Sequence, residues 1–192
     1  IISPTHRHEN FLIILNSKNS LRNQIPMQKN IQNFIPISIE HFWTKLFFCH
    51  RYTEQLHING LNCSEYRLIS DTGAPNYERV LYNVPELNIP RSLQKVVGSS
   101  IGYTERGYFD PKKQEYHFTI EPSTLSSKIK ISGFYYLEAQ GSSACIRNCN
   151  LNFQVSVFGV GKKIESVIAN QFLDNQNKSA AFSATWIADH LS

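Results

Sequence analysis

The chain has 192 residues, of which 41% are hydrophobic and 18% charged, values typical of one globular domain with a sizeable core. Its 19 basic and 15 acidic side chains give a net charge of only +4, and no run of Lys and Arg exceeds two residues. We therefore expect no nucleic-acid partner and no polybasic membrane patch. Because no long apolar stretch occurs, we also expect no stable insertion into a membrane.

The first 30 residues mix Asn, Ser and Gln with scattered charges and show no sustained hydrophobic period. We expect residues 1–30 to form a disordered extension ahead of a single domain at 31–192. The only methionine is Met27, which suggests that residues 1–26 lie upstream of that domain. Few acidic residues precede Glu40, but no amphipathic helix with Arg on one face is apparent, so the cytoplasm is favoured over organelle targeting.

The chain has four cysteines, none of which forms a C-x-x-C pair. If Cys145 and Cys149 lie on one strand, they are roughly 13 Å apart, which is too far for a disulfide. Free thiols in a reducing compartment are therefore expected. A conceivable zinc site would use Cys49, His50, His57 and Cys63. That spacing matches no common structural zinc pattern, so we predict no metal and no other cofactor.

Alternation of apolar and polar residues from Ile31 to Ile37 predicts a first strand, with Pro36 at its edge or end. Ser38 can then cap a helix that begins IEHFWTKLFF, whose apolar residues recur at helical spacing. This helix, or a pair of helices broken near residues 49–51, is expected to run to about Ile58. The Asn59-Gly60 dipeptide would end it.

A run of strands is predicted next, each bounded by turn residues. The expected strands are 64–70, 77–84, 101–109, 115–121 and 128–139. The segments DTGAPN and DPKKQ are the turns within this run. Residues 85–98 contain Pro85 and Pro90, which favour a loop with a short helical piece.

The most regular pattern in the sequence is the alternation from Ala144 to Val157, which predicts a long antiparallel strand with one packed and one wet face. Arg147 places a charge on the face that is otherwise apolar. In one interpretation that face is exposed to solvent near the start of the strand. In the other, Arg147 is a cavity cation paired with a carboxylate such as Glu105, or with an acidic ligand head group.

After Gly159 and Gly161, no Pro or Gly occurs from Lys162 to Ser192, which predicts one helix of about 31 residues. Its apolar stripe contains Ile164, Val167, Ile168, Phe172, Phe182 and Trp186. Three polar residues interrupt the middle of the stripe, namely Gln171, Asn175 and Ser179. Either they face a ligand or ordered water in a cavity, or the helix is solvated there.

The order of strand, helix pair, six antiparallel strands and long C-terminal helix resembles the START-like superfamily (SRPBCC), which includes the Bet v 1 allergens and the polyketide cyclases. The segment PISIEHFWTKLF is similar to its first strand and helix. The segments VSVFGVGKKIESVIANQF and FSATWIADHL more closely resemble a mostly bacterial START-like family of uncharacterised function, although Val160 separates two glycines that are adjacent in that family. The resemblance implies an α+β helix-grip fold: an antiparallel sheet of about seven strands wrapped around a long C-terminal helix, with two short helices after the first strand.

The superfamily binds lipids, sterols and polyketides in a cavity between the sheet and the long helix. The resemblance therefore implies that this chain binds or carries an apolar small molecule or lipid. From strand alternation and helix phase, the candidate ligand-binding residues are Tyr103, Glu105, Tyr116, Phe118, Ile131, Tyr135, Arg147, Cys149, Phe172, Asn175 and Ser179.

Two alternatives remain open from the sequence. A cyclase-like or hydrolase-like enzyme needs an acid-base group in the cavity, for which Glu105, Arg147 or a neighbouring Tyr are the only candidates. No nucleophile elbow, zinc motif or phosphate loop is present, so no catalytic residue is assigned. A protein-interaction domain with a filled core is the other alternative, and the volume of the cavity distinguishes it from a ligand carrier.

Overall fold

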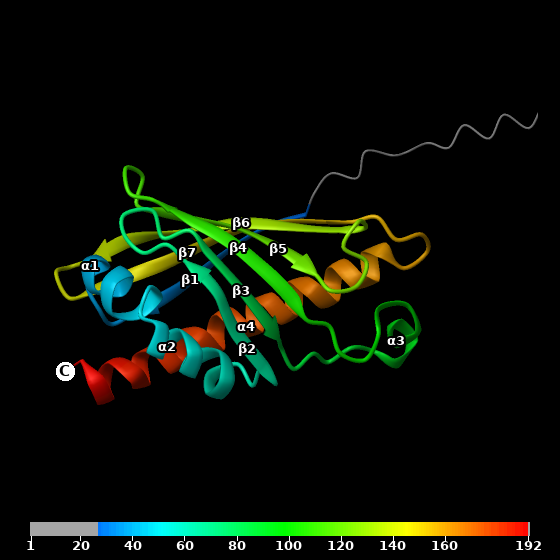
Figure 1. The fold of residues 1–192 in the computed structure, drawn as a ribbon, viewed down its shortest axis with the longest axis horizontal. Helices are drawn as coiled ribbons and strands as arrows, with labels where there is room; N and C mark the ends of the chain where they lie inside the picture. Colours follow the sequence, from blue (N-terminus) through cyan, green and yellow to red (C-terminus); the bar gives the residue numbers. More distant parts are fainter. Residues whose placement is uncertain (1–26, 192) are drawn as a thin grey trace, which may run out of the picture.

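The structure is a computed structural model that describes residues 27–191 (Figure 1). Of the extension expected at residues 1–30, residues 1–26 lie outside the described range, and the expectation is wrong for residues 27–30. The first strand, β1 (Met27–Ile35), begins four residues earlier than the alternation indicated. Met27 pairs with Phe153 and Gln28 with Asn152 of the last strand, so residues 27–30 belong to the sheet. Three of these four residues are polar and exposed, which is why their sequence pattern resembled a tail.

Ser38 caps the helical segment that follows β1, as predicted. Its Oγ accepts a hydrogen bond from the backbone N–H of His41 at 3.3 Å. The segment is broken at residues 48–49 into two helical stretches, which confirms the pair of helices that the sequence offered as the alternative to one continuous helix. It consists of α1 (Ile39–His41), the π-helical turn η1 (Phe42–Phe47), α2 (His50–Gln55) and the π-helical turn η2 (Leu56–Gly60).

Seven antiparallel strands form one sheet in the order β1-β7-β6-β5-β4-β3-β2. The strands after β1 are β2 (Glu65–Asp71), β3 (Arg79–Val84), β4 (Tyr103–Asp110), β5 (Glu115–Pro122), β6 (Ile129–Gln140) and β7 (Ala144–Val155). Each strand from β2 to β7 therefore pairs with its neighbour in the chain, whereas β1 returns to pair with β7. The loop between β3 and β4 contains the predicted short helix, α3 (Arg91–Val97).

The predicted long helix is α4 (Gly161–His190), and it lies along one face of the sheet against β1 and β7 (Figure 1). Gly159 has φ +76°, the left-handed conformation that a sharp turn into the helix requires. A Cβ on Gly161 would lie 3.1 Å from the carbonyl oxygen of Val155. Both glycines thus serve the turn even though Val160 separates them.

Two groups of buried side chains hold α4 and the sheet together. One is mainly aromatic and includes Phe42, Trp43, Tyr52, Tyr116 and Trp186. The other is aliphatic and contains Ile89, Leu93, Val97, Ile129, Val155 and Ile164. The resulting architecture is the predicted α+β helix-grip fold.

Candidate functional site

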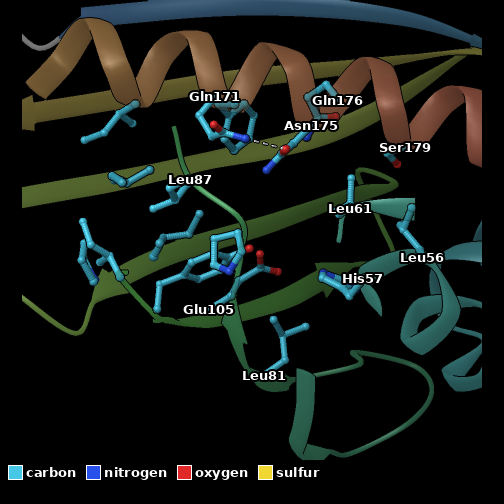
Figure 2. Close-up of a pocket in the computed structure, with 18 of the residues that line it drawn as sticks. Leu56, His57, Leu61, Leu81, Leu87, Glu105, Gln171, Asn175, Gln176 and Ser179 are labelled. Atoms are coloured by element: carbon cyan, nitrogen blue, oxygen red, sulfur yellow. Dashed lines mark hydrogen bonds between the residues drawn. The ribbon is translucent and has the colours of Figure 1, made fainter. Parts of the chain in front are cut away.

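A cavity of about 240 Å³ lies between α4 and the sheet (Figure 2). Its walls come from the turns around α2, from α3, from strands β3 to β7 and from α4. Phe42 and Tyr52 of the aromatic group lie in its wall, as do Leu93 and Ile164 of the aliphatic group. The cavity is therefore bounded by both parts of the core, and most of its lining is apolar.

The structure brings eight of the eleven predicted site residues together in the cavity wall: Tyr103, Glu105, Ile131, Tyr135, Arg147, Phe172, Asn175 and Ser179. The other three, Tyr116, Phe118 and Cys149, lie on the same face of the sheet but not in the wall, and each is at most 3% exposed. The rings of Phe47 and Tyr116 are 4.7 Å apart, and those of Phe118 and Tyr135 are 5.1 Å apart. Strand alternation identified the correct face, but it could not show which of its side chains other aromatic rings cover.

Glu105 on β4 presents a carboxyl group to the interior of the cavity, as Figure 2 shows. Burial raises its pKa from 4.5 to about 7, while the Arg79 charge and a hydrogen bond from Tyr116 act in the opposite direction. The Tyr116 hydroxyl donates to Glu105 Oε1 at 3.4 Å. At neutral pH the carboxyl group is thus close to the midpoint of its titration, which suits both a hydrogen-bonding role and proton transfer.

His57 of η2 also lines the cavity, although the sequence suggested only a metal-binding role for it (Figure 2). Its Nδ1 lies 2.7 Å from the carbonyl oxygen of Thr53. Because a carbonyl can only accept, Nδ1 carries the proton in this contact and Nε2 is left as an acceptor. Burial lowers the pKa of His57 to about 4, so the ring is neutral at physiological pH.

Arg147 is buried, with 5% of its surface exposed. The interpretation that its face of β7 is open to solvent is therefore wrong, because α4 crosses the sheet at this point. Its Nη1 donates to Ser179 Oγ at 2.9 Å, and its Nη2 donates to Asn33 Oδ1 at 3.1 Å and to the Gln176 carbonyl at 3.0 Å. The alternative pairing with Glu105 is also absent from the ion pairs of residues 27–191. Three neutral acceptors hold this guanidinium group instead.

Arg79 on β3 is a second buried cation in the cavity wall, and sequence reasoning did not identify it. Its Nη1 donates to the Phe47 carbonyl at 2.8 Å, and its Nε lies 3.4 Å from Asp71 Oδ2. Within the described part of the chain, Nη2 has no hydrogen-bond partner. The alternation of β3, with Leu81 on the same inward face, was the available sequence signal.

The middle of α4 turns polar groups toward the cavity. Figure 2 shows Gln171, Asn175 and Gln176 on this part of the helix. Gln171 Nε2 donates to Asn175 Oδ1 at 3.1 Å, and Gln176 Nε2 donates to the Tyr135 hydroxyl at 2.8 Å. Gln176 and Ser179 are buried, so the solvated mid-helix interpretation is wrong at Ser179, whereas Gln171 and Asn175 are partly exposed and line the cavity. Gln176 lies outside the apolar stripe defined from the sequence, which is why it was not selected.

The four cysteines carry no disulfide. Burial raises the pKa of the Cys145 thiol to about 11 and that of Cys149 to about 12, so both are uncharged at neutral pH.

Among residues 27–191, no three His, Cys, Asp or Glu side chains gather in a way that could hold a metal ion. No helix in the same range is long and apolar enough to cross a membrane.

The fold is shared with several solved structures. Zhui aromatase/cyclase from a Streptomyces species superposes with a TM-score of 0.62 at 8% sequence identity. The match covers 84% of this chain and 96% of the cyclase. Norcoclaurine synthase from Thalictrum flavum, in complex with dopamine and hydroxybenzaldehyde, gives 0.60 at 15% identity over 94% of this chain and 98% of its own. A START superfamily protein from Mycobacterium smegmatis superposes with a TM-score of 0.57 at 10% identity, over 84% of this chain and 98% of its own. Because the identities are low, these superpositions establish the fold alone, and that fold is START-like.

At the level of sequence, no curated protein matches the chain. A family model does match, and it covers residues 52–187, from α2 to the last turns of α4. This range includes the greater part of the cavity wall. The predicted resemblance to a START-like family of uncharacterised function is thereby confirmed. The chain belongs to the DUF2505 family of proteins of unknown function.

Proposed function

We propose that the cavity binds an apolar small molecule that carries one or more hydrogen-bonding groups. The observation that carries this proposal is an interior volume of about 240 Å³ with mostly apolar walls and a few polar groups on facing elements. Glu105 and His57 face it from one side, and Gln171 and Asn175 from α4 on the other (Figure 2). Apolar walls with a few convergent polar groups are the usual form of a small-molecule site. This supports ligand binding over a filled interaction domain.

The dimensions of the cavity favour a compact ligand. A volume of about 240 Å³ is slightly below the range of about 300–1,000 Å³ that is typical of ligand sites. One or two rings, or a short acyl chain, fit this space better than a complete phospholipid. Because His57 offers an acceptor and Glu105 either accepts or donates depending on its protonation, a ligand hydroxyl or amine has matching partners.

The test is a calorimetric titration of delipidated protein with a panel of short fatty acids, phenols, sterols and quinones. Saturable binding of one molecule per chain by at least one compact member is expected. Native mass spectrometry of the protein purified from its own source then identifies the class of any molecule that co-purifies. If no member of the panel binds saturably and the purified protein carries no added mass, ligand binding is ruled out in favour of an interaction domain.

A second candidate function, general acid-base catalysis, is favoured by one observation. The Glu105 carboxyl group faces an apolar cavity and has a pKa of about 7, close to the value that proton transfer at neutral pH requires. A ketone probe that binds in the cavity would exchange its α-hydrogens with D₂O through Glu105. We expect Glu105→Gln to abolish this exchange, while the matched substitution Glu121→Gln at an exposed site leaves it unchanged. Equal exchange in both variants excludes Glu105 as the base.

A further inference from the structure

One end of the molecule carries an exposed aromatic side chain on a tight turn. Phe158 lies between β7 and α4, directly before Gly159 with its φ of +76°, and it is fully exposed. On the neighbouring helix α3, Val96 is also exposed, at 41%. Leu93 and Val97 of the same helix are buried and line the cavity. α3 therefore stands between the cavity and the exposed side chain of Val96.

Three segments that are distant in sequence meet at this end. Lys163 Nζ at the start of α4 donates to Ser92 Oγ of α3 at 3.3 Å. The backbone N–H of Ser156 donates to the carbonyl of Lys128, in the β5–β6 turn, at 2.7 Å. Figure 1 shows α3, the β5–β6 turn and the β7–α4 turn at the same end of the molecule, opposite the β4–β5 hairpin turn. We call residues 91–98, 121–130 and 156–165 together the tip.

Positive charge is concentrated at the tip. Its basic side chains are all exposed, and they are Arg91, Lys95, Lys128, Lys130, Lys162 and Lys163. Its acidic side chains are Glu121 and Glu165, and Glu165 Oε1 accepts from the backbone N–H of Val155 at 3.3 Å. The rest of residues 27–191 contains 10 basic and 12 acidic side chains, so it has no excess of positive charge. This basic patch was not predictable from the sequence, because three separate segments form it and none contributes more than two adjacent basic residues.

We propose that the tip docks onto an anionic lipid bilayer, with Phe158 and Val96 entering the interface and the six basic side chains contacting acidic head groups. Aromatic side chains favour the membrane-water interface, and each Lys or Arg near an anionic leaflet strengthens binding. Docking in this orientation turns α3, and behind it the aliphatic end of the cavity, toward the bilayer. Passage of a ligand between bilayer and cavity at this point rests on the proposed function, whereas docking itself does not.

Vesicle co-sedimentation of the full chain tests the proposal with two kinds of vesicle, phosphatidylcholine alone and an equimolar mixture of phosphatidylcholine and phosphatidylserine. Binding to the mixed vesicles alone is expected, and it weakens as salt is added. The double variant Lys162→Gln/Lys163→Gln lowers the affinity about thirtyfold, because it removes two charges from the patch. Phe158→Ser lowers it about tenfold through loss of apolar contact.

Matched controls lie outside the tip. Lys112→Gln/Lys113→Gln removes the same charge from the exposed β4–β5 hairpin turn, and Phe34→Ser removes a phenylalanine that is 58% exposed on β1. Both controls are expected to keep wild-type affinity for the vesicles. Wild-type affinity in either tip variant, or equal losses in tip and control variants, overturns the proposal.

Two further outcomes bear on the occupant of the tip. Equal binding to phosphatidylcholine vesicles overturns the requirement for anionic lipid. Tighter binding to a single-stranded oligonucleotide, lost in the same tip variants, assigns the surface to nucleic acid and also overturns the proposal. Ligand titration of Phe158→Ser separates docking from the cavity function, because wild-type ligand affinity combined with weakened vesicle binding supports docking as a distinct property of the tip.

Discussion

Arg147 Nη1 donates a hydrogen bond of 2.9 Å to Ser179 Oγ, which joins the middle of α4 to β7 in the interior of the protein. The same guanidinium group donates to the Gln176 carbonyl on α4 and to Asn33 on β1. A buried cation therefore connects the long helix to the two strands that it covers. Because its three acceptors are neutral, their number and geometry must offset the cost of burying the charge.

Ser179→Ala is expected to lower the free energy of unfolding by about 2 kcal/mol, the usual contribution of a buried hydrogen bond to a charged group. Ser166→Ala is the matched control, since Ser166 is exposed on α4 and its hydroxyl bonds only to the Lys162 carbonyl of the same helix. This control should change stability by a few tenths of a kcal/mol at most. Urea denaturation measures both variants, and equal effects would show that the Arg147 contact contributes nothing.

Glu105 should make the folded protein less stable as pH rises. Its pKa is about 7 in the folded state and near 4.5 in the unfolded chain, so between these values the folded state binds more protons. The linkage relation then gives a loss of stability from about pH 4.5 to pH 7, of about 3 kcal/mol at most.

The variant Glu105→Gln removes this contribution. Its unfolding free energy, measured in urea, should exceed that of the wild-type protein at pH 8 by more than it does at pH 5. A difference that does not change with pH would contradict the raised pKa. Glu121→Gln, at an exposed site on the same β-hairpin, is the control for loss of one carboxylate.

His57 should have the opposite effect in an overlapping range. Its folded pKa is about 4, below the value of 6.5 for the unfolded chain, so the unfolded state binds more protons between these values. The stability that this residue contributes is complete above pH 6.5 and is lost as pH falls through 4, by about 3 kcal/mol at most.

In the wild-type protein the effects of Glu105 and His57 partly cancel, and only the variants separate them. His57→Gln should lose less stability than the wild-type protein between pH 6.5 and pH 4. His41→Gln at an exposed site is the control. Parallel acid-denaturation curves for His57→Gln and the wild-type protein would mean that His57 is protonated as readily in the folded state as in the unfolded one.

Local signals in the sequence were sufficient for most of the architecture. Ser38 has the position and chemistry of a helix cap, and the alternation after Ala144 identifies the packed face of β7 without knowledge of its neighbours. The length of α4 follows from the absence of Pro and Gly after Gly161. These features depend on residues close together in the chain, which is why they are predictable.

The site was less predictable because it depends on contacts between distant segments. Arg147 is buried only because α4 crosses β7 at Ser179, and a strand pattern contains no information on that crossing. His57 reaches the cavity through the position of η2 relative to the sheet, and its neutral state follows from burial there. Phe118 lies on the predicted face of the sheet but does not reach the cavity wall, since the rings of Phe172 and Tyr135 stack close to its own.

The most direct test of ligand binding is to fill the cavity from α4. Val167 is half-buried in the cavity wall, so Val167→Phe occupies space that the ligand needs, whereas Leu173 is 46% exposed on the same helix and Leu173→Phe does not. Calorimetric titration with the tightest-binding member of the panel should show at least a tenfold loss of affinity for Val167→Phe and none for Leu173→Phe. Equal affinities in the two folded variants would contradict the claim that the ligand lies between the sheet and α4.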